Sequence, residues 1–312
     1  MSEVKHEVLL QAKGIYKNFE TSKKDQAVHA LTNVDLTLYR GETLALVGES
    51  GCGKSTLGRT LIRMLPATRG SVTFEGQNIT AMKDKEFAPL RRRMQMVFQD
   101  PYASLDPRMK VRDIIAEPLE TYHVCKTKAE TTHRVLELMQ AVGVPAEFLN
   151  RYPHQFSGGQ RQRIGIARAL IVEPEFIIAD EPISALDMSI RAQVLNLLRH
   201  LQKERGITYL FIAHDLSVMR YISDRIAVIH KGDIVELADA EELATHAIHP
   251  YTRSLLSAIP MPNPRLERKK KLLVYDPAMH DYTQEAPQWR ELRPSHWVLC
   301  SEQEAKDWLA EM

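Results

Sequence analysis

The chain of 312 residues is 44% hydrophobic and 26% charged, a composition typical of globular proteins with about two domains. Its 41 Lys and Arg residues nearly balance its 40 Asp and Glu residues, so the formal net charge of +1 gives no reason to expect nucleic-acid binding. No apolar stretch is long enough to span a bilayer, and residues 1–6 lack the apolar core of a signal peptide. We therefore expect a cytoplasmic protein whose contact with any membrane comes through partners.

Apolar segments separated by polar turns predict strands in the first part of the chain. Residues 28–38 alternate irregularly and read as one or two strands, and the polar stretch 20–26 reads as a hairpin loop before them. The run 43–47 is apolar except for its first residue, as in a strand buried on both faces. Further strands are expected over residues 7–13 and 71–74.

A glycine-rich loop lies between the strand at 43–47 and a helix expected over 57–65. Its glycines allow a tight turn that brings backbone N–H groups onto an anion, and the helix N-terminus adds further donors. Lys54 supplies a mobile positive charge for β- and γ-phosphates, and Ser55 supplies a hydroxyl for Mg²⁺. The flanking strand and helix disfavour the alternative, a chance glycine-rich turn. We therefore predict that a nucleotide binds the loop residues Gly48, Glu49, Ser50, Gly51, Cys52, Gly53, Lys54, Ser55 and Thr56.

The middle of the chain changes from strands to helices and back. Strand signals are absent from 101 to about 170, where we expect an inserted helical subdomain. Its clearest helix covers 127–142, with Val135, Leu136, Leu138 and Met139 on one side. Strands alternating with helices elsewhere argue for a parallel sheet wrapped by helices. These strands are expected at 94–99 (after a helix that ends in the basic residues 91–93), 176–180, 208–212 and 225–230, with a long amphipathic helix at 188–203.

The character of the sequence changes after about residue 260. The proline-rich residues 260–264 read as a stiff linker. The basic segment 265–271 reads as solvated, with contact to lipid headgroups or an acidic partner surface as the alternative. Two short apolar runs, 272–275 and 296–299, and a helical end follow.

Four further motifs follow the glycine-rich loop along the chain and narrow its activity. Together with Gln99 they resemble, in the family's order, the motif set of ATP-binding cassette (ABC) transporter ATPases. The resemblance covers roughly residues 7–260. The motifs are Ser157-Gly158-Gly159-Gln160 with the helix up to Leu170, the strand end Ala179-Asp180-Glu181-Pro182, the segment Ser184-Ala185-Leu186-Asp187, and His214 at the end of its strand.

Asp180 and Glu181 have a physical reading beside the resemblance. A parallel strand delivers its C-terminal end to the ligand crevice of an α/β sheet, and Asp180 ends such a strand. A carboxylate there can hold Mg²⁺ directly or through water, and Glu181 can polarise the water that attacks the γ-phosphate. A surface pair of carboxylates is the alternative, which the preceding apolar strand disfavours.

Ser157 and Gln160 have the spacing of an N-terminal capping box. A Ser-Gly-Gly helix start also exposes backbone donors suited to a second phosphate site. The resemblance implies that residues 157–160 contact the γ-phosphate of ATP bound to a partner's loop, so that ATP lies between two such domains arranged head to tail.

The resemblance also implies roles for isolated residues. Gln99 would sense Mg²⁺ and the attacking water, His214 would contact the γ-phosphate, and Asp187 would lie at the seam between two cassettes. Ser55, Gln99 and Asp180 would be the Mg²⁺ residues. Phe19 matches the aromatic residue on which adenine stacks; Tyr16 is the alternative, and for either residue a place in the core is the other reading.

Three segments resemble the oligopeptide/dipeptide/nickel permease branch of the family. They are Gln99 to Arg108, Arg151-Tyr152-Pro153-His154-Gln155, and His249-Pro250-Tyr251-Thr252-Arg253-Ser254-Leu255-Leu256. The branch implies an α/β phosphate-loop fold, with a parallel-sheet core, an antiparallel β-subdomain and an inserted helical subdomain. We expect this nucleotide-binding domain at 1–260, with the helical subdomain at about 101–170, and a C-terminal extension of the oligopeptide-transporter type at 261–312.

The cysteines depart from the pattern of many relatives, whose extensions carry a cluster that resembles an iron–sulfur site. Cys52, Cys125 and Cys300 lie far apart, and the extension holds only Cys300. We therefore expect no iron–sulfur cluster, and the spacing of His280, His296 and Cys300 fits no metal site. Cys52 reads as a small tolerated residue, with oxidation sensitivity as the alternative.

The branch implies a subunit that hydrolyses ATP to drive import of oligopeptides, with ATP and Mg²⁺ as cofactors. Expected partners are a second homologous ATP-binding subunit, two membrane permeases and, through these, an extracellular or periplasmic peptide-binding protein; nucleic acid is not expected. This places the chain at the cytoplasmic face of the membrane. Dipeptide, nickel or glutathione cargo is one alternative. The other is a soluble cassette ATPase acting on ribosomes or DNA, which the near-zero net charge and the single motif set disfavour.

Overall fold

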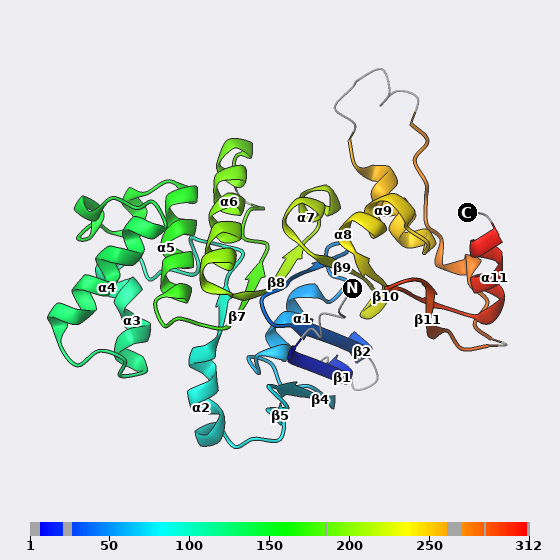
Figure 1. The fold of residues 1–312 in the computed structure, drawn as a ribbon, viewed down its shortest axis with the longest axis horizontal. Coiled ribbons are helices and arrows are strands. Elements are labelled where there is room, and N and C mark those ends of the chain that lie inside the picture. Colours follow the sequence, from blue (N-terminus) through cyan, green and yellow to red (C-terminus); the bar gives the residue numbers. More distant parts are fainter. Residues whose placement is uncertain (1–6, 21–26, 185, 261–269, 284, 311–312) are drawn as a thin grey trace, which may run out of the picture. The chain divides into compact units, whose positions relative to one another are not determined.

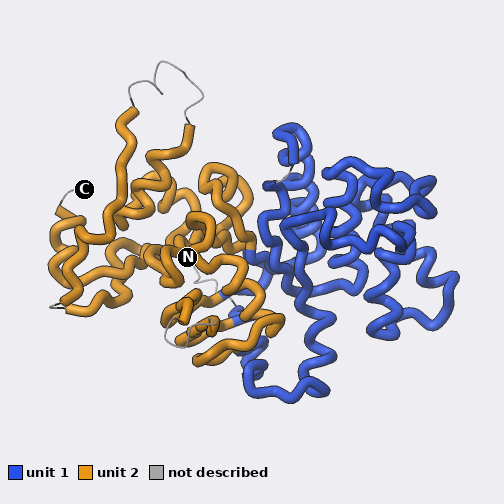
Figure 2. Tube along the Cα trace, turned by 180° about the vertical axis from the view of Figure 1, so that it is seen from behind, with its two compact units in different colours: residues 1–10, 38–42, 73–210 blue, residues 11–37, 43–72, 211–312 orange. Residues whose placement is uncertain are grey.

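The computed structural model describes residues 7–20, 27–184, 186–260, 270–283 and 285–310. The chain forms two compact units, each built from several stretches of sequence (Figure 2). Unit 1 comprises residues 1–10, 38–42 and 73–210, and unit 2 comprises residues 11–37, 43–72 and 211–312. Most of the expected linker 260–264 and of the basic segment 265–271 lies outside the described residues, as do most of the expected hairpin loop and residues 1–6.

The N-terminal strands form a four-stranded sheet in the order β2-β1-β4-β5 (Figure 1). The first strand runs six residues beyond its predicted end at 13, because the alternation of buried and exposed side chains continues through Tyr16. Residues 28–38, for which the sequence leaves open one or two strands, belong to a single strand. The bounds are β1 Val8–Phe19, β2 Val28–Tyr39, β4 Arg69–Phe74 and β5 Gln77–Asn78.

Among the residues that the structure describes, eight strands form the larger sheet, which has parallel and antiparallel parts. In unit 2 its order is β11-β12-β10-β9-β3, with β3 and β9 parallel and the pairs β9·β10, β10·β12 and β11·β12 antiparallel. In unit 1, β6 and β7 are parallel neighbours. Every residue of β3, β7 and β8 is buried, as expected for strands covered on both faces. The bounds are β3 Thr43–Val47, β6 Met94–Val97, β7 Phe176–Asp180, β8 Thr208–Ala213, β9 Arg225–His230, β10 Asp233–Asp239, β11 Gln288–Arg293 and β12 His296–Cys300.

Unit 1 holds the helical region that the sequence predicts. The structure describes all of residues 101–170 and places helices and loops there, with no strand. Helix α3 packs against α4 and α5 through its buried side chains. Of the four side chains expected on one side of this helix, Val135, Leu138 and Met139 are buried in α4 and Leu136 is half-buried. The helices are α2 Asp84–Arg93, α3 Val111–Thr121, α4 Lys128–Ala141, α5 Gly158–Leu170 and α6 Met188–Arg205, with single 3₁₀ turns at Ala146–Phe148 and Pro153–Gln155.

Unit 2 holds shorter helices. The first begins three residues earlier than predicted, because Gly53 adopts a left-handed conformation and ends the loop there. Among the described residues, no helix combines the length and apolar content that a bilayer span requires. The helices are α1 Lys54–Leu61, α7 Leu216–Ile222, α8 Ala240–His246, α9 Pro250–Ala258 and α11 Glu302–Ala310, with a 3₁₀ turn at Pro277–Met279.

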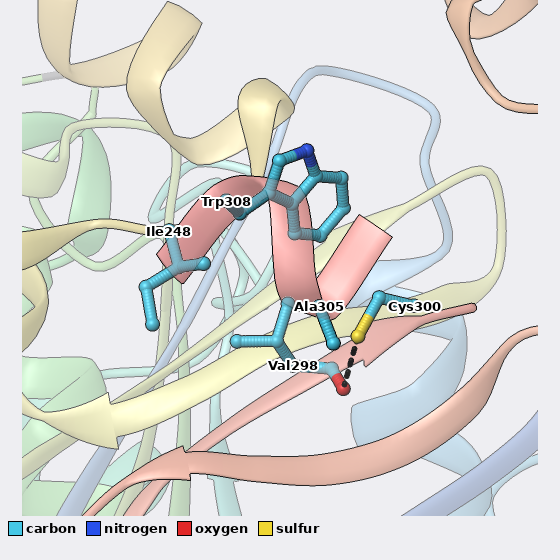
Figure 3. Packing of buried hydrophobic residues seen from close by; sticks show 5 residues of the cluster. All are labelled: Ile248, Val298, Cys300, Ala305 and Trp308. Carbon is cyan, nitrogen blue, oxygen red and sulfur yellow. Dashed lines mark hydrogen bonds between the residues drawn. The ribbon is translucent and has the colours of Figure 1, made fainter. Parts of the chain in front are cut away.

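The C-terminal extension continues the sheet of unit 2. Strand β12 pairs with β10, and β11 pairs with β12. A small core joins the extension to the segment before α9, with Ile248 packed among side chains of β12 and α11 (Figure 3). His296 of β12 is fully buried, and its Nε2 lies 2.7 Å from a carboxylate oxygen of the equally buried Glu236 in β10. The run 296–299 is thus part of a strand, whereas 272–275 forms neither a helix nor a strand.

Candidate active site

The glycine-rich loop connects β3 to α1 in unit 2, and close backbone contacts require its glycines. Gly53 has φ +109°, and a Cβ there would lie 2.5 Å from the Ala30 carbonyl oxygen. A Cβ on Gly48 would lie 2.2 Å from the Ile229 carbonyl oxygen. These distances leave no room for a side chain, so both positions require glycine. Gly51 has φ +80° with open space around it, so its requirement is conformational alone.

Lys54 lies inside the curve of this loop. Its side chain is in the first turn of α1 and the residue is only 5% exposed. The ammonium Nζ donates to the carbonyl oxygens of Gly48 at 2.8 Å and Glu49 at 2.7 Å. A helix N-terminus, whose first N–H groups have no partner within the helix, thus adjoins a buried ammonium and a glycine-rich loop. These residues fit the phosphates of a nucleotide, because they provide donors, positive charge and space for close backbone approach.

Residues far away in the sequence support the loop, and no motif in the sequence points to this role. Gly232, in the turn between β9 and β10, donates its N–H to the Cys52 carbonyl oxygen at 2.9 Å. The Glu49 N–H donates to the hydroxyl oxygen of Tyr251 in α9 at 3.0 Å. The sequence marks Tyr251 only as part of a segment that resembles one branch of the family. Burial raises the pKa of the Cys52 thiol, which makes the thiolate scarce and favours the reading of Cys52 as a tolerated small residue.

Two more predicted residues lie in unit 2. His214 directly follows β8 and is exposed, and Asp215 behind it caps α7 by accepting the Ser217 N–H at 3.0 Å. Phe19 ends β1 and is 38% exposed, with the Lys17 ammonium 4.9 Å from its ring centroid. An exposed aromatic ring is not a core residue, so the core reading of Phe19 is wrong. Its proposed stacking on adenine stays a prediction, with half-buried Tyr16 as the alternative.

Unit 1 brings Gln99 and Glu181 together. The amide Nε2 of Gln99 donates to Oε2 of Glu181 at 2.7 Å. Because β6 and β7 are parallel neighbours, the residues that follow them meet at the same edge of the sheet, and Gln99 and Glu181 each lie within two residues of a strand end. Asp180 ends β7 and is 1% exposed.

The backbone of Glu181 is strained. Its φ is +45°, a left-handed conformation that non-glycine residues rarely adopt and that costs about 1–3 kcal/mol. The Ser184 N–H and hydroxyl both donate to the Glu181 carbonyl oxygen, at 3.2 and 3.0 Å, and hold this conformation. Strain of this kind persists where the surroundings enforce it, and it is concentrated at functional sites.

The segment 157–160 starts α5, and the capping box is confirmed. The Gln160 N–H donates to Ser157 Oγ at 3.3 Å, and the Ser157 N–H donates to Gln160 Oε1 at 3.1 Å. A Cβ on Gly159 would lie 2.4 Å from Cγ2 of Ile190 in α6, whereas one on Gly158 would lie 3.8 Å from Leu186. Gly159 is therefore required for the packing of α5 on α6 whatever else it binds.

Asp187 immediately precedes α6 and is exposed. Arg191, which lies in none of the sequence motifs, donates its Nε to the Leu186 carbonyl oxygen at 2.7 Å and thereby fixes the backbone beside Asp187. This hydrogen bond joins residues five positions apart, and it forms only because the loop before the helix folds back toward Arg191, so the sequence alone does not predict it.

The donor chemistry of Ser55, Asp180 and Gln99, with hydroxyl, carboxylate and amide oxygens, suits a hard cation such as Mg²⁺. Within the described ranges, no group of three or more His, Cys, Asp or Glu side chains is arranged to hold a metal ion. Cys300 is buried, and its thiol lies 3.8 Å from the Val298 carbonyl oxygen (Figure 3).

Comparison with known proteins identifies the family. The oligopeptide transport ATP-binding protein OppF of Bacillus subtilis is 57% identical over 302 residues, which cover 96% of this chain and 98% of that protein. The protein of the same name from Streptococcus mutans is 54% identical over 96% of each chain. The chain belongs to the ABC transporter ATP-binding proteins. The family described as ABC transporter matches residues 31–184, and the C-terminal region of the oligopeptide/dipeptide transporter family matches residues 235–284.

The fold agrees with this membership. A solved dimeric ATP-binding cassette in a post-hydrolysis state, bound to ADP and Pi, superposes with a TM-score of 0.68 at 30% sequence identity. The superposed region covers 74% of this chain and 99% of the solved cassette. The expected α/β phosphate-loop fold of an ABC cassette is therefore confirmed, and as a member of this family the chain is an ABC-type ATPase.

Proposed function

We propose that this ABC ATPase drives the import of oligopeptides across the cytoplasmic membrane. The observation that carries the proposal is the near-complete coverage of OppF-type relatives at more than half identity, extension included. Import of dipeptides is the second candidate, because the dipeptide transport ATP-binding protein DppF of Lactococcus lactis is 51% identical over 96% of each chain.

The proposed chemistry assigns a role to each side chain of the site. Lys54 and the loop N–H groups bind the phosphates. Ser55, Asp180 and Gln99 are the residues that would hold Mg²⁺, which when bound would supply positive charge for the phosphates. Glu181 accepts a proton from the water that attacks the γ-phosphate. Its contact with Gln99, at 2.7 Å, supports a common position for the two side chains at the attacking water. His214 contacts the γ-phosphate and helps to align the attack.

A complete site requires a second cassette in this proposal. Residues 157–160 would close the nucleotide on a partner's loop, and the partner's equivalent segment would close the nucleotide on Gly48–Thr56, with Asp187 at the seam. The dimeric cassette found by comparison supports such an assembly. We propose a different, homologous ATP-binding subunit as the partner, on two permeases at the cytoplasmic face of the membrane. The permeases receive cargo from a peptide-binding protein, and no nucleic acid takes part.

Uptake measurements test the function. A strain lacking the gene should lose uptake of labelled oligopeptides and regain it with the wild-type chain but not with Glu181→Gln. Labelled dipeptides, glutathione and nickel in the same strains identify the alternative cargoes. Unchanged oligopeptide uptake with loss of dipeptide uptake would favour the second candidate, and co-purification with ribosomes instead of permeases would contradict both.

A further inference from the structure

The hydrogen bond between Tyr251 and Glu49 acts on one peptide group of the phosphate loop. The N–H of Glu49 and the C=O of Gly48 belong to the same planar peptide unit. Tyr251 accepts from the N–H at 3.0 Å, and the Lys54 ammonium donates to the C=O at 2.8 Å. This peptide group is therefore held at both ends, and its orientation determines where the Gly48 carbonyl oxygen receives the Lys54 ammonium.

Tyr251 itself is firmly held. It is 1% exposed, and its N–H donates to Nδ1 of His249, which caps α9, at 3.1 Å. The Ile248 and His249 N–H groups in turn donate to the buried carboxylate of Glu236, at 2.7 and 3.3 Å. The segment that carries the tyrosine is thus fixed by a buried carboxylate before the helix begins, which limits how far the hydroxyl can move.

Aromatic side chains of β9 and of the extension pack against the ring of Tyr251. The ring centroid of His230 lies 4.2 Å from that of Tyr251, and the ring centroid of Tyr275 lies 5.3 Å from it. Burial raises the pKa of the Tyr251 hydroxyl, so the group stays protonated and neutral. Phenylalanine would be sufficient if the ring served only for packing. The hydroxyl group of tyrosine is what accepts the hydrogen bond from the phosphate loop.

We propose that Tyr251 is a positioning residue for ATP, which orients the Gly48–Glu49 peptide group and thereby the Lys54 ammonium and the neighbouring loop donors toward the phosphates. The proposal rests on the nucleotide-binding role of the loop. It gives the His-Pro-Tyr segment a part in the ATPase site, and it makes residues beyond 260 contribute to phosphate binding through the packing of Tyr275.

The test compares Tyr251→Phe with Tyr282→Phe. The control removes a hydroxyl from the same cluster, where Tyr282 contacts His280 Nδ1 at 3.1 Å. Calorimetric titration of the purified chain measures the Kd of ATP and ADP in Mg²⁺, and the assembled transporter supplies KM and kcat. We expect Tyr251→Phe to raise both Kd values and KM about three- to tenfold, with a smaller change in kcat, because one loop hydrogen bond is lost.

The outcomes separate the possible explanations. Tyr282→Phe should leave the Kd of ATP at its wild-type value, and the melting temperature of both variants without nucleotide should stay near that of the wild type. Equal Kd values for Tyr251→Phe and wild type would overturn the proposal, as would equal weakening by both substitutions. Failure of the wild-type chain to bind ATP would instead contradict the proposed function.

Discussion

At the scale of single residues, Glu181 combines a strained backbone with the position expected of a catalytic carboxylate. Its φ is +45°, and its carboxylate accepts a hydrogen bond from Gln99. The strain is a property of the folded loop, so no local sequence signal reveals it. The motif predicts the carboxylate; only the structure shows that its backbone conformation is costly.

Glu181→Gln should separate ATP binding from hydrolysis. The amide keeps the shape of the side chain but cannot accept a proton, so steady-state hydrolysis should fall by about 10²–10⁴-fold. The Kd of ATP should stay within a few-fold of wild type, because the phosphate-binding residues are intact. Phosphate release by the assembled transporter and nucleotide titration measure the two quantities; hydrolysis at the wild-type rate would remove Glu181 from its role.

Glu181→Gly and Glu181→Ala should differ in stability although both lose the carboxylate. Alanine in a left-handed conformation keeps the steric penalty, whereas glycine does not, so the glycine variant should be more stable by about 1 kcal/mol. Urea unfolding of the two purified variants measures the difference. Equal stabilities would show that the strain at this position is absent in solution.

At the scale of secondary-structure elements, the start of α5 carries two adjacent glycines with different surroundings. Gly159 faces Ile190 of α6 at a distance that excludes a methyl group, and Gly158 has room for one. The branched Ile190 cannot move its Cγ2 away without a rotamer or backbone change. The packing of α5 on α6 therefore depends on the second glycine rather than the first.

Gly159→Ala should destabilise the chain more than Gly158→Ala. Overpacking against Ile190 should cost about 1–3 kcal/mol, whereas the matched change at Gly158 meets ordinary contact distances. Thermal unfolding of the two variants without nucleotide measures the difference. Adding Ile190→Val to Gly159→Ala should not restore stability, because valine keeps the branch at Cβ. Adding Ile190→Ala to Gly159→Ala should restore it, because alanine removes the clashing Cγ2 atom. Equal melting temperatures for the two glycine variants would contradict the packing argument.

The elements also show which parts of the site the sequence predicts. Strand β3, the loop and α1 are contiguous, so periodicity and glycine spacing are sufficient to place Lys54 and Ser55. The meeting of Gln99 with Glu181 depends on the pairing of β6 with β7, and the Tyr251–Glu49 hydrogen bond joins residues 202 positions apart. Such contacts follow from tertiary structure, and no local pattern encodes them.

At the scale of the whole molecule, charged side chains far apart in the sequence form ion pairs with one another. In unit 1, Arg40 and Arg93 both bind Glu75 and Glu175. The Arg93 guanidinium, with help from Arg40, lowers the pKa of the Glu175 carboxyl to about 2 from its ordinary 4.5. The folded chain therefore holds this carboxylate ionised at pH values where the unfolded chain protonates it.

Glu175→Gln should lower stability at pH 7 and matter less in acid. Because the pKa of Glu175 is depressed on folding, its contribution is fully present above pH 4.5 and is lost as pH falls toward about 2. The gap in free energy of unfolding between wild type and variant should shrink from pH 7 to pH 4. Urea unfolding at these two pH values measures it. A gap that widens in acid would show that the carboxylate does not act through ionisation.

The pairing of β12 with β10 has a consequence for shortened forms of the chain. With residues 261–312 removed, β10 would become the edge of its sheet, with its backbone N–H and C=O groups unpaired and the Glu236 carboxylate deprived of His296. An open strand edge is a template for pairing with other chains. A chain that ends at residue 260 should therefore self-associate, and size-exclusion chromatography would reveal this. In the full chain, the extension protects the edge of β10 from such pairing.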